Sequence, residues 1–331
     1  MILIISQNYL EHSTDKVIDW IHHKEINFQR INGIDFYKKV NIEIGDNGAK
    51  LKLNNLDWDK VGAIWFRRWV APQNSSEILL KKVHSEESDS LIRQLNKFIR
   101  DEFKVLTTYF FDWVPKNKVF DKIFDNEINK LKVLQKAAEL GIKIPRTYIH
   151  NNKNDYEYIK NKFEELITKP ISNGPAIDIG KKTYVAYTSK CDNIPDEVGE
   201  KFAPSLNQPL INKKYEIRSF FLKDRFYSMA IFSQADSQTE LDFRKYNHIR
   251  PNRTIPYKLP EDVEYKLSCL ADHFGLNSGS FDLIKTTENE YVFLEVNPGG
   301  QFGMVSYPCN YYLEEEIANE LINLNNNNHV F

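Results

Sequence analysis

One stretch of this chain restricts its fold more than any other: residues 291–301, which read Tyr-Val-Phe-Leu-Glu-Val-Asn-Pro-Gly-Gly-Gln. The apolar and aromatic run predicts a strand, and the Pro-Gly-Gly that follows predicts a turn. Glu295 and Asn297 are two residues apart, so a strand directs both side chains to one face. A carboxylate flanked by apolar strand residues needs a partner if it is buried. The alternative interpretation is an exposed Glu295 followed by an ordinary turn.

A second candidate strand lies upstream and carries Asp282 within Ser280-Phe-Asp-Leu-Ile284. The polar residues 285–290 between the two strands predict a hairpin, which would place Asp282 beside Glu295 and Asn297. Hard oxygen donors on adjacent strands suit Mg²⁺, which takes carboxylates together with phosphate oxygens. The two strands therefore predict a magnesium site that serves ATP chemistry.

Composition limits the class of protein. The 331 residues allow about two domains, and a hydrophobic fraction of 41% supplies substantial cores. A net charge of −2 gives no general basic field for nucleic acid. No signal peptide and no apolar run of transmembrane length stand out, and the three cysteines form no CxxC pair. We therefore expect a cytoplasmic protein without a membrane or nucleic-acid partner.

The predicted strands and helices divide the chain into three α+β parts. Residues 1–115 alternate strand and helix patterns and predict a small α/β domain. Residues 116–207 open with a strongly amphipathic helix at 129–141, which ends at a glycine. Residues 208–331 predict mainly antiparallel strands that carry the magnesium site.

Phosphate groups need cations as well as a metal, and two lysines are suitably placed. Lys130 lies in the first turn of the predicted helix, and Lys169 ends a predicted strand before a glycine turn at 172–175. An ammonium group acts as a mobile point charge for phosphate oxygens. The alternative for Lys130 is a solvated helix lysine, and both interpretations stay open for Lys169.

Glu216 and Arg218 alternate along another predicted strand, so their side chains share a face. The glutamate could hold ribose hydroxyls, and the guanidinium could stabilise a transferring phosphoryl group. The alternative is a cross-strand ion pair, which contributes little energy. The polar segment 233–253 adds Arg244, which could reach a γ-phosphate or an acidic substrate, or lie in a solvated loop.

Other patterns in the chain are less specific. Arg67 and Arg68 follow a strand, where α/β folds gather binding residues, and salt bridges between domains explain them equally well. The eight histidines show no HExxH spacing, and no Ser-His-Asp order stands out. Zinc and hydrolase chemistry are therefore disfavoured.

In their order along the chain, these parts resemble the ATP-grasp fold over the whole length, with residues 1–115 as the pre-ATP-grasp domain. Within that superfamily the chain is most similar to graspetide synthetases, the microviridin-type peptide ligases, and to the grasp-with-spasm maturases. The likeness is carried by Ile64-Trp-Phe-Arg-Arg68, Tyr215-Glu-Ile-Arg218, Ser233-Gln234, Asp242-Phe-Arg244 and Phe293-Leu-Glu-Val-Asn-Pro-Gly-Gly-Gln-Phe302.

The resemblance implies a role for each candidate residue. Asp282, Glu295 and Asn297 would hold two Mg²⁺ ions. Arg218 and Arg244 would be catalytic and stabilise the γ-phosphoryl group and the acylphosphate. ATP would be bound by Lys130 and Lys169 at the α- and β-phosphates, by Glu216 at the ribose, and by the hinge 208–212 with Gln208, Leu210 and Ile211 at adenine.

The resemblance also implies an activity and partners. The substrate would be a ribosomal precursor peptide with a leader and an acidic core. Its Asp or Glu side chains would be activated as acylphosphates and joined to Ser, Thr or Lys in ester or amide crosslinks, by an enzyme that is a homodimer. One alternative is a glutamate-type ligase that adds amino acids to a protein terminus or a small molecule. Another is a non-catalytic ATP-binding module.

The chain departs from the ATP-grasp pattern at two places. Many ATP-grasp enzymes carry an arginine two residues before the first metal aspartate, and here that position is Ser280. Arg218 or Arg244 would have to supply that charge. The loop after Lys169 is also less rich in glycine than in many relatives.

Overall fold

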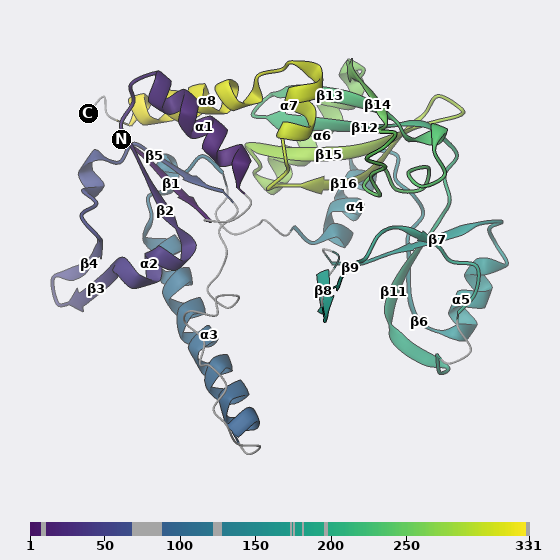
Figure 1. Cartoon of the computed structure of the whole chain (residues 1–331), viewed down its shortest axis with the longest axis horizontal. Coiled ribbons are helices and arrows are strands. Elements are labelled where there is room, and N and C mark those ends of the chain that lie inside the picture. The colour runs from purple at the N-terminus through teal and green to yellow at the C-terminus, as the bar shows by residue number, and fades with distance from the viewer. Residues whose placement is uncertain are drawn as a thin grey trace. The chain divides into compact units, whose positions relative to one another are not determined.

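A computed structural model of the chain separates it into two compact units (Figure 1): Met1–Phe124 with Tyr312–Phe331, and Asp125–Tyr311. It describes residues 1–7, 11–67, 88–121, 128–172, 174, 176–180, 182–194 and 198–328. Arg68, Asn173 and Pro175, which belong to predicted motifs, lie outside the described residues.

The first unit is built on a three-stranded parallel sheet in the order β2-β1-β5. The central strand β1 (Ile2–Ser6) is buried along its whole length, because its sequence is Ile-Leu-Ile-Ile-Ser. The neighbouring strands are β2 (Phe28–Asn32) and β5 (Ala63–Phe66). A continuous apolar run of this kind is typical of a parallel strand covered on both faces, so the predicted α/β character of this region is confirmed.

Helices and a hairpin cover this sheet. α8 (Leu313–Asn327) packs on α1 (His12–His23) and also contacts β1 and β5, and Figure 1 shows the two helices side by side. A large core cluster joins alternate residues of β1 to aromatic residues such as Phe36 and Phe110. The other elements of this unit are α2 (Gly33–Lys39), β3 (Val40–Gly45), β4 (Gly48–Leu53), α3 (Ser88–Trp113) and the 3₁₀ turns Trp58–Lys60 and Lys116–Lys118.

The observed units differ from the predicted boundaries. Residues 312–331, expected within the third part of the chain, group with the first unit. The reason is the apolar stripe of α8, including the buried Leu313, Ile317 and Leu321, since this helix packs against α1 and β5. The boundary between units falls after residue 124 rather than after 115, and the predicted division after residue 207 stays a prediction.

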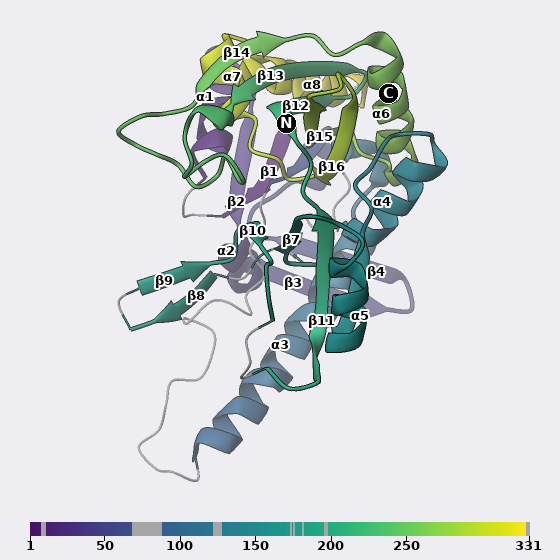
Figure 2. The same cartoon turned by 90° about the vertical axis from the view of Figure 1, so that its right-hand side faces the viewer.

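The second unit contains a five-stranded antiparallel sheet in the order β14-β13-β12-β15-β16. One face of this sheet packs on helices α4 (Lys130–Glu139) and α6 (Glu261–Phe274), through residues such as Phe281 and Phe293. Figure 2 shows both helices beside the sheet. The strands are β12 (Lys213–Leu222), β13 (Arg225–Phe232), β14 (Arg253–Tyr257), β15 (Ser278–Thr286) and β16 (Tyr291–Asn297).

The opposite face of this sheet carries the polar candidate residues. Along β12, Ile217 and Phe221 belong to the core with α4 and α6, so the alternating Glu216 and Arg218 point to the other face. The helix α7 (Gly303–Cys309) lies on that other face, because Phe302 packs on Phe220 with ring centroids 5.6 Å apart.

A smaller four-stranded sheet completes the second unit, in the order β10-β7-β11-β6. The helix α5 (Lys153–Lys160) packs on it through Tyr156 and Ile159, both buried. None of the helices in the described part of the chain combines the length and the apolar character needed to cross a membrane. The remaining elements are β6 (Tyr148–Asn152), β7 (Leu166–Lys169), β10 (Ser189–Lys190), β11 (Lys201–Pro209), the hairpin of β8 (Ala176–Ile179) with β9 (Lys182–Val185), and the 3₁₀ turn Ser233–Ala235.

Candidate active site

Three polar side chains form one ledge on β15 and β16, as the alternation of the sequence predicted. In the antiparallel register, Asp282 lies opposite Glu295, and Ser280 lies opposite Asn297. The amide Nδ2 of Asn297 lies 3.3 Å from Glu295 Oε1 and 3.4 Å from Asp282 Oδ2. We refer to Asp282, Glu295 and Asn297 as the acidic ledge.

Two cations neutralise the acidic ledge. Arg218 lies opposite Asp282 on β12, and its Nη1 donates to both carboxylate oxygens at 3.1 and 3.2 Å. Lys130 at the start of α4 places Nζ 3.1 Å from Glu295 Oε2. These side chains are at most 19% exposed. Removing one partner of such a pair would leave an uncompensated buried charge, so the ledge needs its cations while no ligand is bound.

Lys169 and Arg244 add two further positive charges that interact with the ledge carboxylates. Burial lowers the pKa of Lys169, and the nearby Glu295 carboxylate opposes that shift. Arg244 binds Asp242 through Nε at 2.8 Å and Nη2 at 2.7 Å, and these hydrogen bonds raise the pKa of Arg244. The carboxylates of Glu295 and Asp282 raise it further, so Arg244 also lies within electrostatic reach of the ledge.

The two carboxylates of the ledge differ in their protonation. Burial raises the pKa of Asp282 to about 6, and the charge of Glu295 adds to this while Arg218 opposes it. Burial also acts on Glu295, but Lys130 and Lys169 outweigh it and lower the pKa of Glu295. Glu295 is therefore the more acidic member, and Asp282 takes up a proton more readily on acidification.

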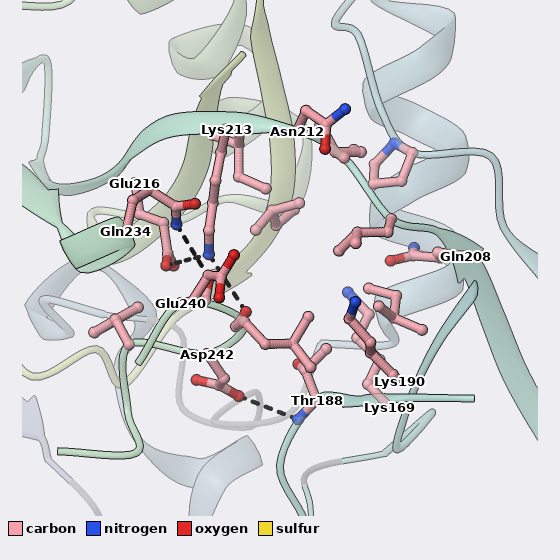
Figure 3. Close-up of a pocket in the computed structure, with 18 of the residues that line it drawn as sticks. Lys169, Thr188, Lys190, Gln208, Asn212, Lys213, Glu216, Gln234, Glu240 and Asp242 are labelled. Carbon is pink, nitrogen blue, oxygen red and sulfur yellow. Dashed lines mark hydrogen bonds and ion pairs between the residues drawn. The ribbon is translucent and has the colours of Figure 1, made fainter. Parts of the chain in front are cut away.

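Glu216 lies in a second buried cluster, with one partner that the sequence analysis missed. Its Oε1 accepts hydrogen bonds from Lys213 Nζ at 2.5 Å and from Ser233 Oγ at 2.9 Å. Lys213 also donates to the carbonyl of Leu241 at 3.3 Å, and Figure 3 shows both bonds. Burial raises the pKa of Glu216, against the effect of Lys213. A strict alternation places Lys213 on the opposite face from Glu216, and an irregularity between Lys213 and Tyr215 brings them together.

A cavity of about 600 Å³ in the second unit is lined by members of both clusters, among them Asp282, Glu295 and Glu216. This size is typical of small-molecule sites. Its apolar walls include Ile167, Ile284 and Leu294, together with Leu210 and Ile211 of the predicted hinge. The polar side chains that line it include Lys169, Lys190, Gln208, Lys213, Glu216, Asp242, Arg244, Asp282 and Glu295.

The polar groups divide between different sides of the cavity. Figure 3 shows Lys169 and Lys190 together on one side, and Lys213 with Glu216 on another. Gln208 lines the cavity while its Nε2 donates to Thr147 Oγ1 at 2.8 Å. Apolar walls with charges of both signs suit a ligand that has a flat apolar part and an anionic part. Lys190, like Lys213, carried no distinctive sequence signal.

The donor set of the ledge fits Mg²⁺ that is shared with phosphate groups. Two carboxylates and one amide oxygen are hard donors, and they leave the other positions of an octahedral ion open. Among the described residues, no group of three or more His, Cys, Asp or Glu side chains could hold a metal by itself. The ledge therefore suits a metal that arrives with a ligand rather than a closed structural site.

Solved structures match the chain along nearly its whole length. One is the macrocyclase MdnC from Microcystis aeruginosa MRC, bound with the precursor peptide MdnA: it is 25% identical, and the match covers 97% of this chain and 99% of that chain with a TM-score of 0.76. Another is a RiPP-associated ATP-grasp ligase from Chryseobacterium gregarium, in complex with ADP and a leader and core peptide. It is 23% identical, with 97% and 96% of the two chains covered and a TM-score of 0.77.

A third match is the ATP-grasp ligase PsnB, complexed with a phosphomimetic variant of a minimal precursor, Mg and ADP. It is 15% identical, with 98% of each chain covered and a TM-score of 0.72. No family model and no curated protein matches the sequence. The likeness is thus one of three-dimensional structure, and it extends through both compact units.

Proposed function

We propose that this chain, which has the ATP-grasp fold of the graspetide synthetases, is an ATP-dependent peptide ligase that uses Mg²⁺. It activates Asp or Glu side chains of a ribosomal precursor peptide as acylphosphates. It then joins each activated side chain to a Ser or Thr hydroxyl or a Lys amine of the same peptide. The products are intramolecular ester or amide crosslinks.

The observation that carries this proposal is the meeting of the acidic ledge with buried cations at the edge of the cavity. The ledge supplies carboxylates for a metal, and Lys130 and Arg218 already lie within 3.1 Å of those carboxylates. When a nucleotide binds, each cation can exchange its carboxylate for phosphate oxygens. The site thereby keeps its charges paired in both states, which favours reversible binding of a highly charged ligand.

The rest of the cavity suits the nucleoside. Leu210 and Ile211 of the hinge, with the apolar walls, would hold adenine, and the backbone groups of the hinge would bind its polar edge. Glu216 would accept hydrogen bonds from the ribose hydroxyls. Burial raises the pKa of Glu216, and Lys213 favours the charged form against this effect because it donates to the carboxylate directly. Lys169 and Lys130 would contact the α- and β-phosphates.

In the first reaction step, a carboxylate oxygen of the peptide attacks the γ-phosphorus of ATP. The bond between that phosphorus and the bridging oxygen breaks, so ADP leaves with the electron pair and an acylphosphate remains. Mg²⁺ on Asp282, Glu295 and Asn297 would neutralise charge on the phosphate oxygens. Arg218 and Arg244 would hold positive charge beside the transferring group, and the two hydrogen bonds from Arg244 to Asp242 fix that guanidinium, so it needs little rearrangement.

In the second step, a hydroxyl or amine of the same peptide attacks the acyl carbon. The new C–O or C–N bond replaces the bond to phosphate, which leaves with the electron pair, and the proton of the nucleophile passes to the departing phosphate or to water. The two arginines would again stabilise the negative oxygen during this step. The chain's own contribution is positioning and charge, without a covalent enzyme intermediate.

The two alternative functions are less well supported. A glutamate-type ligase would share the activation step, but the matching structures hold precursor, leader and core peptides. A non-catalytic module has no use for buried, paired carboxylates at the phosphate end of the cavity. Homodimer formation and a cytoplasmic location stay predictions.

The decisive assay incubates the protein with ATP, Mg²⁺ and the precursor peptides encoded beside its gene. We expect peptide products that have lost the mass of one water per crosslink, together with one ADP per crosslink. Tandem mass spectrometry should map each loss to an acidic side chain paired with Ser, Thr or Lys. A gain of mass by one amino acid would instead support the glutamate-type ligase, and ADP without any dehydrated peptide would contradict the proposal.

We expect the affinity for MgADP to fall below about pH 6. Asp282 must be ionised to bind a metal, and its pKa of about 6 means that it takes up a proton on acidification. The loss should approach about tenfold per pH unit, the limit for one competing proton. Isothermal titration calorimetry between pH 5 and pH 8, about one to two units on either side of this pKa, measures the affinity for MgADP.

Asp282→Asn is the matched control, since the nucleotide phosphates and Glu216 titrate equally in both proteins. This variant should bind MgADP weakly, and the part of the pH dependence that belongs to Asp282 should be absent. Identical pH dependence in the two proteins would show that another group is responsible.

A further inference from the structure

A rigid loop after β13 presents apolar side chains to solvent. Asn247 Nδ2 donates to Asp236 Oδ2 at 2.7 Å, and Asn247 Oδ1 accepts from the backbone amides of Ile249 and Arg250, both at 3.0 Å. Gln238 Nε2 donates to the carbonyl of Tyr246 at 3.0 Å. These bonds fix the loop, although Tyr246 is 48% exposed and Ile249 is 98% exposed. Exposed apolar side chains that gather in one patch are typical of interaction sites, whereas single ones are common on any surface.

The helix α7 continues this surface. The hydroxyl of Tyr246 lies 4.0 Å from Met304 Sδ, and His248 stacks on Tyr246. Tyr307 lies one helical turn after Met304, so both point to the same side of α7. Tyr307 is 60% exposed, and its ring covers Gly303 so closely that a Cβ there would lie 3.1 Å from it. We refer to Tyr246, Met304 and Tyr307 as the aromatic rim.

The helix α7, which carries two residues of the aromatic rim, packs on the same face of the sheet as the acidic ledge. Tyr246 follows Arg244 by two residues, and Arg244 lines the cavity. The segment that leads to α7 begins directly after Asn297 of the ledge. The rim is therefore close along the chain to Arg244 and Asn297, and α7 lies on the face of the sheet where the acceptor carboxylate would be activated.

We infer that the aromatic rim binds the part of the substrate peptide next to the activated carboxylate, through an apolar or aromatic side chain of that part. This inference rests on the proposed function. Arginines inside the site suit the acidic side chain, while the exposed rings outside suit an uncharged neighbour. The rim is too small for a second copy of the chain, because stable interfaces involve roughly 20–30 residues on each side.

The recognition is testable with the precursor peptide that forms crosslinks in the assay above. A second version of this peptide carries serine in place of the apolar residue beside the acceptor. For the natural peptide, Tyr307→Ser should raise KM about tenfold and leave kcat within about twofold, as expected for an exposed tyrosine contact made equally in the ground and transition states. For the serine peptide, the wild type and the variant should have the same high KM, because the two changes remove one contact.

Tyr265→Ser is the matched control, since Tyr265 is 71% exposed on α6, which packs on the other face of the sheet. It should change neither KM nor kcat. An equal rise of KM for both peptides in Tyr307→Ser would overturn the inference, and so would a changed oligomeric state at unchanged KM. A wild type that binds MgADP but dehydrates no candidate precursor would contradict the proposed function, and the inference with it. That result is distinct from an equal rise of KM for both peptides and from a changed oligomeric state.

Discussion

Glu295→Gln should reduce the rate of peptide crosslinking by about 10³-fold, a loss of the size seen when a transition-state charge is left without its partner. Glu295 is the ledge residue whose pKa is lowered, so it supplies constant negative charge to a metal. The substitution also leaves Lys130 Nζ, now 3.1 Å from Glu295 Oε2, without its counter-charge beside Lys169. We therefore expect weaker MgADP binding as well as a lower kcat, measured by ADP release and by mass spectrometry of the peptide.

Glu290→Gln is the matched control for this variant. Glu290 lies at the end of the same β15–β16 hairpin, but it is exposed and its partner is Lys143 rather than a residue of the cavity. An exposed ion pair contributes at most about 1 kcal/mol, so this variant should behave as the wild type does. If Glu295→Gln kept more than about a tenth of the activity, an effect of at most about 1.4 kcal/mol, the metal assignment would be wrong.

Part of the acidic ledge was predictable from local rules, since a strand of period two places Glu295 and Asn297 on one face. The hairpin brings Asp282 close to them, but the exact pairing with Glu295 depends on an irregularity between Asp282 and Leu283 that shifts the register by one residue. The same irregularity allows Phe293 to lie in the core although strict alternation would place it on the same face as Glu295. Sequence reasoning succeeded where the contacts lie close along the chain.

Contacts between residues far apart in the chain were harder to predict from the sequence. Nothing local links Lys130 on α4 to Glu295, and its salt bridge depends on how that helix packs against β16. Lys213 was not predicted as a partner of Glu216, because a strand irregularity turns its side chain toward that residue. The helix α8 joined the first unit for a similar reason: its apolar stripe is compatible with any apolar surface, and only packing selects α1 and β5. Packing of this kind is set by tertiary contacts rather than by periodicity.

Phe281→Ala should destabilise the second unit by about 3–5 kcal/mol, the usual cost of truncating a fully buried phenylalanine. Phe281 is 0% exposed, and its ring lies 5.8 Å from that of Phe226 and 6.1 Å from those of Phe221 and Phe293. The loss is large beside the roughly 5–15 kcal/mol that stabilises a typical domain. Urea denaturation, monitored by far-UV circular dichroism, would measure the change in unfolding free energy.

The Phe281→Ala substitution should also disturb the active site, because Phe281 precedes Asp282 on β15 and packs in the core on the opposite face of that strand. We expect MgADP to recover part of the lost stability, since a ligand that binds only the folded state shifts the unfolding equilibrium. Tyr265→Ala, an aromatic truncation at a 71% exposed position of the same unit, should change stability by less than about 0.5 kcal/mol. A Phe281→Ala effect as small as that would mean that the core beneath the ledge does not hold β15 in place.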